Sequence, residues 1–164
     1  MKRTTILAIA LPLAGFVSIF LLIRRNAEPP ISAVVAPGAE LGFPIERAAE
    51  RVTKKPFGLY LTPNTSPVNP ERFSGYHVGV DFETFDHERD SDVKIFVICD
   101  GALALKKSSA GYGGMAVQRC VLEDRPITVV YGHLRLESIV AKVGDTLKRG
   151  EALGLLGKGY SPET

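Results

Sequence analysis

Apolar and polar positions after residue 90 alternate in short runs that are typical of β-strands. Glycine and acidic turns separate these runs, for example Asp100-Gly101 and Gly144-Asp145. The connections are too short to contain the helical crossovers that parallel strands need. The pattern predicts an all-β domain of antiparallel strands, with strands at 93–98, 102–105, 115–122, 127–131, 139–143 and 152–156.

Residues 4–23 show a different pattern, a run of twenty residues without a charged side chain. As a helix with a rise of about 1.5 Å per residue, such a run spans the roughly 30 Å hydrocarbon layer of a membrane. It predicts a single-pass transmembrane anchor. A signal peptide is the alternative, although its apolar region usually has about 7 to 15 residues.

Basic residues stand on both sides of this run, Lys2-Arg3 before it and Arg24-Arg25 after it. The positive-inside rule therefore only slightly favours a cytoplasmic start of the chain. Both interpretations export the domain that follows. An anchored chain places it in the periplasm or on the cell surface, and signal cleavage would release it as a secreted protein.

Prolines concentrate in the next segment, because eight of the 11 lie between Pro29 and Pro70. Such a segment is expected to be extended and poor in regular hydrogen bonds. Within it, apolar residues at helical spacing from Ile45 to Val52 predict a short amphipathic helix that ends before Pro56. The predicted organisation is an anchor or signal segment at 1–25, a linker with a short helix at 26–56 and a β core domain at 57–164.

Composition and charge narrow the function classes. The chain of 164 residues has room for one domain after its N-terminal segment. Its 45% hydrophobic and 23% charged residues exclude a fully disordered chain. Four of the 20 basic residues lie in the first 25 positions, which contain no acid, so the remainder has 16 basic against 18 acidic residues. Without a basic surplus there, we expect no nucleic-acid partner.

The two cysteines, Cys99 and Cys120, flank a predicted hairpin centred near residues 109 to 110. That hairpin would set them almost opposite each other. Because export brings the domain into an oxidising compartment, a disulfide between them is permitted. Two buried free thiols in an apolar sheet are the alternative, since cross-strand disulfide geometry is demanding.

Any histidine-based chemistry is limited to three residues, His77, His87 and His133. His77 precedes Asp81 by four positions, and imidazole and carboxylate are both zinc-ligand types. On a straight strand their α-carbons would lie about 13 Å apart. Joint coordination therefore requires the backbone between them to bend inward, which Gly79 permits. The spacing also arises by chance, so it needs support from other motifs.

The other two histidines stand in contrasting settings. His133 follows an apolar run that ends at Gly132, and a strand end can hold a catalytic side chain rigidly beside a groove. A half-buried histidine that is hydrogen-bonded in a sheet is the alternative. His87 lies in the acidic run from Glu83 to Asp92, which is either a solvated loop or a weak cation site.

Five blocks of sequence, taken together, resemble the lysostaphin-like or LytM-type zinc endopeptidases, which cut peptide bonds in bacterial peptidoglycan. The blocks are Gly-Tyr-His-Val-Gly-Val-Asp-Phe at 75–82, Cys-Asp-Gly-Ala-Leu at 99–103, Gly-Tyr-Gly-Gly-Met-Ala-Val at 111–117, Val-Tyr-Gly-His-Leu at 130–134 and Val-Gly-Asp-Thr-Leu-Lys-Arg-Gly-Glu-Ala-Leu-Gly at 143–154. The resemblance extends from about Phe57 to the last residue. One block would mean little, but five in the right order make coincidence improbable.

This resemblance implies roles for particular residues. His77 and Asp81 are expected to be ligands of a zinc ion, and His133 the active-site histidine that assists the attacking water or the developing oxyanion. A substrate groove is implied along Gly111 to Gly114, where a peptide would lie against small residues. The expected groove residues are Tyr112, Gly113, Gly114 and Tyr131.

The resemblance also implies a fold and a function. The fold is an antiparallel sheet sandwich or barrel-sandwich hybrid core, here preceded by a transmembrane helix and a Pro-rich lead-in. The function is that of an exported zinc metalloendopeptidase. Its expected partners are peptidoglycan peptides and, through the N-terminal helix, the membrane.

The sequence departs from the family near its end. The family's third zinc ligand and second active-site histidine lie in a His-x-His motif shortly after the strand that corresponds to 152–157. The sequence ends at Thr164 without this motif. Two protein ligands are too few for a catalytic zinc ion, which usually has three. We expect that the sequence is an incomplete record of the protein and that the motif lies beyond Thr164. A shortened, inactive protein is the alternative.

Two classes of function therefore stay open, the peptidase and a non-catalytic cell-wall binding or regulatory domain of the same fold. A third interpretation is a lipoyl or biotinyl carrier or an efflux adaptor, because the segment 143–153 is similar to a hairpin of those folds. Carriers present a lysine at a hairpin tip, usually beside methionine. Lys106-Lys107 has no methionine neighbour, which argues against this third interpretation.

Overall fold

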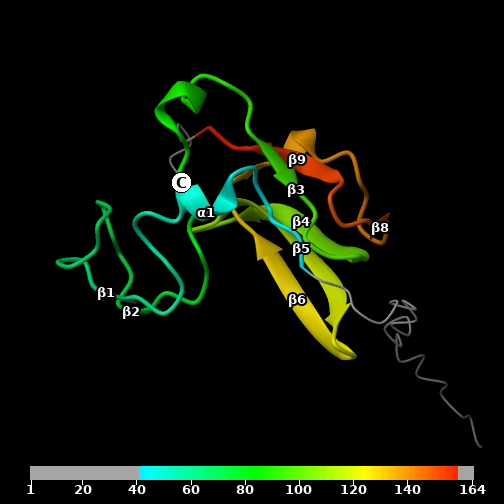
Figure 1. Ribbon diagram of the computed structural model, residues 1–164, viewed down its shortest axis with the longest axis horizontal. Helices are drawn as coiled ribbons and strands as arrows, with labels where there is room; N and C mark the ends of the chain where they lie inside the picture. Colours follow the sequence, from blue (N-terminus) through cyan, green and yellow to red (C-terminus); the bar gives the residue numbers. More distant parts are fainter. Residues whose placement is uncertain (1–40, 159–164) are drawn as a thin grey trace, which may run out of the picture. The chain divides into compact units, whose positions relative to one another are not determined.

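The computed structural model describes residues 41–158 (Figure 1). The predicted anchor or signal segment at 1–25 and the last six residues, 159–164, lie outside the described residues. Within 41–158, none of the helices has the length and apolar character needed to cross a membrane.

Antiparallel strands form nearly all of the regular structure in the described part of the chain. The strands are β1 (Tyr60–Leu61), β2 (Gly75–Tyr76), β3 (Lys94–Phe96), β4 (Gly101–Ser109), β5 (Gly113–Leu122), β6 (Arg125–Tyr131), β7 (Leu134–Arg135), β8 (Thr146–Leu147) and β9 (Ala152–Leu156). The helical elements are the four-residue α1 (Ala48–Arg51) and the 3₁₀ turns η1 (Asp86–Glu88) and η2 (Leu136–Ser138). The prediction of an all-β domain with antiparallel strands is therefore confirmed.

The strands form three sheets, ordered β1-β2, β3-β9-β7 and β6-β5-β4-β8. The longest sheet is built on the hairpin of β4 and β5, which pairs Ser109 with Gly113 across a turn at Gly111. The φ angle of 79° at Gly111 favours glycine. Between β5 and β6, Glu123 and Asp124 both have positive φ angles, as a two-residue turn between twisted antiparallel strands requires.

The predicted strand at 139–143 is wrong. This segment follows η2 and has no strand partner; instead, Lys106 Nζ donates hydrogen bonds to the carbonyl oxygens of Ile139 at 2.8 Å and Ala141 at 3.0 Å. Ile139 enters the core, whereas Val140 is exposed. The strand partner of β4 is formed a few residues later, by β8. A lysine side chain thus takes the place of a neighbouring strand, which the apolar pattern does not reveal.

The predicted helix at 45–52 is shorter than expected, because only Ala48–Arg51 is helical. Arg47 has a left-handed backbone with φ of 53°, which prevents the helix from starting at Ile45. Ile45 and Ala48 nevertheless belong to the hydrophobic core. Backbone hydrogen bonds also join Gly42 N to Ile98 O and Phe96 N to the carbonyl oxygen of Pro44. The described part of the predicted linker, 41–56, therefore packs on the β domain.

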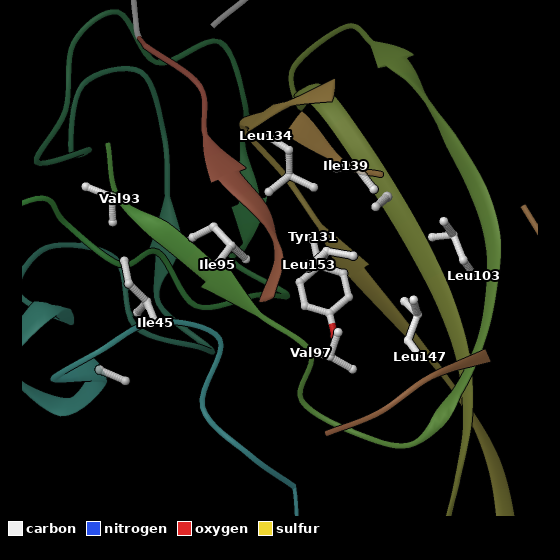
Figure 2. Packing of buried hydrophobic residues seen from close by; sticks show 12 residues of the cluster. Ile45, Val93, Ile95, Val97, Leu103, Tyr131, Leu134, Ile139, Leu147 and Leu153 are labelled. Carbon is white, nitrogen blue, oxygen red and sulfur yellow. The ribbon is translucent and has the colours of Figure 1, made fainter. Parts of the chain in front are cut away.

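The hydrophobic core is formed by side chains from the two larger sheets (Figure 2). Ile95 and Leu153 come from β3 and β9, and Leu103 and Leu147 come from β4 and β8. Tyr131, at the end of β6, points into the same cluster. These residues hold the two sheets together and fix the end of β6, which leads directly to His133.

A buried polar network accompanies the apolar core. Cys99 and Cys120 are joined by a disulfide. Gln118, which is fully buried, donates from Nε2 to the carbonyl oxygen of Cys99 at 2.8 Å. The Tyr131 hydroxyl donates to Gln118 Oε1 at 2.8 Å and accepts a hydrogen bond from the Ile98 N–H at 3.1 Å. Burial raises the pKa of Tyr131 to about 12, so its hydroxyl remains a donor at neutral pH.

This network predicts the effect of removing one hydroxyl. Tyr131→Phe should lower the free energy of unfolding by about 1–3 kcal/mol, because the Ile98 N–H and Gln118 Oε1 would each lose a buried partner. Tyr76→Phe is the matched control, since Tyr76 is 65% exposed. Urea denaturation of both variants measures the difference. Equal losses of unfolding free energy in the two variants would show that the buried hydrogen-bond network does not stabilise the fold as proposed.

Candidate metal site and groove

His77 and Asp81 converge. The Nε2 atom of His77 lies 3.3 Å from Oδ1 of Asp81. An extended strand would separate these residues by about 13 Å at the α-carbons, so the chain has bent between them. The bend follows directly from the end of β2 at Tyr76, since residues 77–81 are not in a strand.

A second segment, 55–61, holds this bend by backbone hydrogen bonds. The N–H of His77 donates to the carbonyl oxygen of Leu59, and the His77 carbonyl oxygen accepts from Gly58, both at 2.8 Å. Further along, the N–H of Asp81 donates to the carbonyl oxygen of Lys55 at 3.1 Å. The two segments therefore run antiparallel past each other, continuing the pairing of β1 with β2. This pairing fixes the positions from which both side chains project.

Groups outside the pair fix how the two side chains face each other. His77 Nδ1 lies 3.2 Å from the carbonyl oxygen of Pro56. Because a carbonyl oxygen can only accept, this contact places a ring proton on Nδ1; in the neutral imidazole, Nε2 then carries the lone pair and faces Asp81. On the other side, Lys55 Nζ lies 3.3 Å from Asp81 Oδ2 and 3.3 Å from Glu71 Oε2.

The electrostatics of Lys55 and Glu71 agree with a lasting ion pair. Burial lowers the pKa of Lys55, but the charges and hydrogen bonds of Asp81 and Glu71 outweigh it, and the net shift is upward. The pKa of Glu71 is lowered, first by the hydrogen bond from the N–H of Phe73 and further by Lys55. Both groups are therefore charged at neutral pH.

The geometry of the pair fits two ligands of zinc. Two donors at about 2.0 to 2.1 Å from a tetrahedral zinc ion lie about 3.3 to 3.4 Å apart, and His77 Nε2 and Asp81 Oδ1 are 3.3 Å apart. A lone pair on Nε2 and a carboxylate oxygen are suitable donor atoms. Within 41–158, however, no group of three or more His, Cys, Asp or Glu residues is arranged to hold a metal ion. The described residues thus provide two donors.

The acidic run from Glu83 to Asp92 has a structural partner that the sequence analysis did not identify. Arg51, only 2% exposed, makes a two-pronged ion pair with Glu88, at 2.6 and 2.7 Å. The Arg51 guanidinium also stacks on the Phe85 ring at 4.0 Å and donates to the carbonyl oxygen of Glu83. His87 is exposed and stacks on Phe85. This arginine ties α1 to the segment that follows Asp81.

The hydrogen bond from Arg51 lowers the pKa of Glu88 to about 2, with further help from the N–H of Phe85. Since this pKa is below the unfolded value of 4.5, the ionised carboxylate stabilises the fold above pH 4.5. That contribution is lost as the pH falls from 4.5 towards 2.

His133 lies in a groove of about 590 Å³. Its φ angle is 54°, an uncommon left-handed conformation for a residue other than glycine, and its side chain is exposed. Two short backbone hydrogen bonds hold this conformation, from His133 N to the Tyr112 carbonyl oxygen and from Gly157 N to the His133 carbonyl oxygen, both at 2.6 Å. The turn between β4 and β5 and the end of β9 therefore fix His133 at the end of β6.

Gly113 and Gly114 line the same groove. At Gly114 the absence of a side chain has a cause inside the fold, because an added β-carbon would lie 1.9 Å from the carbonyl oxygen of Leu134. The structure gathers the predicted site residues into two groups, His77 with Asp81, and Gly113 and Gly114 with His133.

The two predicted groove tyrosines occupy other positions. Tyr131 is only 6% exposed, its hydroxyl is bonded inside the core, and it is not among the residues that line the groove around His133. Side chains alternate between the two faces of β6: the preceding residue, Val130, is exposed, and Tyr131 points inward. Tyr112 is exposed, and its carbonyl oxygen accepts the hydrogen bond from His133.

Charged residues near both groups were missed by the sequence analysis. Arg135 and Asp92 line the groove and form an ion pair at 2.6 Å. The hydrogen bond from Arg135 lowers the pKa of Asp92. Lys55 stands beside Asp81, and Glu71 stands beside Lys55. Arg135 is two residues beyond His133 and Glu71 six residues before His77, so both had a signal in the sequence, but Lys55 lies 22 residues before His77.

Comparisons with known proteins do not identify a function for this chain. No protein-family model matches the chain, and no curated protein matches it. The two groups of residues, and the sequence motifs that contain them, are therefore the features that point to a function.

The Arg51–Glu88 pair predicts a change in acid stability. Glu88→Gln should lower the melting temperature at pH 7 by about 5 °C or more, because it leaves the buried Arg51 without its counter-charge. It should also flatten the fall in stability between pH 4.5 and about 2. Thermal unfolding followed by circular dichroism across this pH range measures both effects.

Glu50→Gln is the matched control for this experiment. Glu50 pairs with Arg47 on the same segment of chain, but both side chains are more than half exposed, so this ion pair should contribute little. An acid profile of Glu88→Gln that runs parallel to the profile of the unaltered chain would refute the assignment of the pH dependence to Glu88.

Proposed function

We propose that this chain is an exported zinc metalloendopeptidase that hydrolyses peptide bonds in peptidoglycan. The observation that carries the proposal is the 3.3 Å approach of His77 Nε2 to Asp81 Oδ1, in which each donor atom is turned towards the other by a separate contact. The resemblance of five sequence blocks to LytM-type endopeptidases supports it. The finer fold, a barrel-sandwich hybrid, is part of the same proposal.

His77 and Asp81 would hold the zinc ion. The chemistry supplied by a bound zinc ion is polarisation of the scissile carbonyl and activation of water near neutral pH. A catalytic zinc site usually has three protein ligands, so in this proposal the third comes from outside residues 41–158.

His133 supplies the acid–base function in this proposal. Its imidazole is exposed in the groove and held at a rigid strand end, where it can move a proton or donate a hydrogen bond to the developing oxyanion. Gly113 and Gly114 form an adjacent wall without side chains, which lets a peptide backbone approach closely. Arg135 and Asp92 give the groove charged groups of both signs.

The proposed location is the outer side of a membrane. Residues 4–23 would span the membrane once or act as a signal peptide, with the domain in the periplasm or on the cell surface. The disulfide between Cys99 and Cys120 supports an oxidising compartment.

A second candidate function is a cell-wall binding or regulatory domain without catalysis. The observation that favours it is that the described residues bring together two metal donors rather than three. Such a domain would use the groove around His133 to bind peptidoglycan peptides without cutting them. Sedimentation of the metal-free chain with purified peptidoglycan, and release of new amino groups on zinc addition, separate the two candidates.

The proposal predicts that zinc binding and hydrolysis share the same two residues. His77→Ala and Asp81→Ala should each abolish specific zinc binding, measured by calorimetric titration, and hydrolysis of peptidoglycan, measured by release of amino groups. His87→Ala is the matched control, because His87 is exposed and its ring stacks on Phe85. Hydrolysis that survives alanine at both 77 and 81 would disprove the zinc site.

His133 should separate binding from turnover. His133→Ala is expected to retain the zinc affinity of the unaltered chain and to lose about 10² or more in turnover, since it removes an acid–base group. Zinc titration and initial rates of hydrolysis measure the two properties. Loss of zinc binding in this variant would show that His133 is a ligand instead.

A further inference from the structure

Two successive residues, Lys55 and Pro56, contact the two candidate zinc ligands on the sides that face away from each other. The carbonyl oxygen of Pro56 lies 3.2 Å from His77 Nδ1, and Lys55 Nζ lies 3.3 Å from Asp81 Oδ2. The atoms left free by these contacts are Nε2 and Oδ1, the two that approach to 3.3 Å. One short segment of chain thus orients both groups.

We infer that Lys55 is a positioning residue of the metal site, which holds the Asp81 carboxylate so that one oxygen is presented to the metal ion. This inference rests on the proposed function. Metal-binding carboxylates commonly need such a hydrogen-bonded partner behind them, and its loss typically weakens metal binding by about 10- to 100-fold.

Asp81 needs this partner because its side chain is otherwise poorly confined. The side chain is 45% exposed, and the terminal torsion of an aspartate is broad. Lys55, by contrast, is 16% exposed and lies between Asp81 and Glu71. An ammonium group held on one oxygen restricts rotation of the carboxylate and keeps the other oxygen towards His77.

Glu71 keeps Lys55 in place. Its Oε1 atom accepts hydrogen bonds from the backbone N–H groups of Arg72 and Phe73, both at 3.0 Å, and its Oε2 atom accepts one from the Ser66 hydroxyl at 3.2 Å. A rigid chain of contacts therefore leads from the backbone at 72–73 through Glu71 and Lys55 to Asp81. Such support of a ligand by its surroundings is what a metal site requires.

Lys55 has two opposite effects on metal binding: its contact with Asp81 orients a ligand and favours binding, whereas its positive charge opposes binding. An ammonium group next to a ligand repels a divalent cation. Glu71 offsets that repulsion because its carboxylate is ionised and lies 3.3 Å from Nζ. With the Lys55 charge offset in this way, orientation of Asp81 decides the sign, and removal of Lys55 weakens metal binding.

The preceding residue offers a matched control. Lys54 carries the same charge, but it pairs with Glu83 at 2.8 Å and is 46% exposed. Lys54→Met therefore changes the net charge as Lys55→Met does, and it leaves the contact with Asp81 intact.

The experiment compares Lys55→Met, Lys55→Arg and Lys54→Met in the full chain. Zn²⁺ alone is titrated calorimetrically, and the visible absorption spectrum of bound Co²⁺ reports the coordination geometry of the ion. We expect Lys55→Met to weaken zinc binding by about 10- to 100-fold and to alter the cobalt spectrum. Lys55→Arg, which keeps a donor for the carboxylate, should restore most of the affinity, and Lys54→Met should match the unaltered chain.

Three results would overturn the inference: unchanged zinc binding in Lys55→Met, tighter binding because charge repulsion dominates, or equal weakening in Lys54→Met. Asp81→Asn, titrated alongside, separates this inference from the proposed function. Zinc binding that is insensitive to Asp81→Asn refutes the metal site itself. Binding that depends on Asp81 but not on Lys55 refutes only the role of Lys55.

Discussion

The antiparallel pairing of residues 55–61 with 75–81 is the constraint on which the candidate metal site depends. Hydrogen bonds at Leu59 and Lys55 fix the backbone at His77 and Asp81, respectively. Between these two points the chain leaves the extended conformation, so that side chains four residues apart meet at 3.3 Å. The backbone hydrogen bonds to this second segment hold the bend.

Charged side chains at the start of this second segment and just before it complete that arrangement. Arg51 binds Glu88 beyond the site, and Lys55 binds Asp81 within it. The side chains of Arg51 and Lys55 are both largely buried. Each makes ion pairs and hydrogen bonds with carboxylates, and these contacts compensate the cost of burying its charge. A segment that precedes the β domain in the sequence is therefore part of the site.

The groove depends on backbone packing in a similar way. His133 is held in a left-handed conformation between the β4–β5 turn and the end of β9. Gly114 lets the carbonyl oxygen of Leu134 approach β5. Tyr131, two residues before His133, anchors the end of β6 through the buried network with Gln118. The exposed histidine thus stands on a rigid support, which suits an acid–base role.

Much of the fold and part of the site followed from local patterns. Alternating apolar residues and glycine turns predicted the antiparallel β4, β5, β6 and β9, because side chains on a strand have a period of two. His77, Asp81 and His133 were identified as candidate residues from short motifs, each of which spans only a few neighbouring residues. The strand predicted at 139–143 failed because Lys106, from another strand, binds its carbonyl oxygens.

The sequence by itself determined the strand class, the turn positions and the residue types able to bind a metal ion. Tertiary structure alone decided that Lys55 stands between Asp81 and Glu71, that Arg51 pairs with Glu88 of the acidic run, and that Tyr131 faces the core. The physical reason is that propensity and periodicity act over a few neighbouring residues. Ion pairs and hydrogen bonds between residues 16 to 37 positions apart form only after the chain has folded.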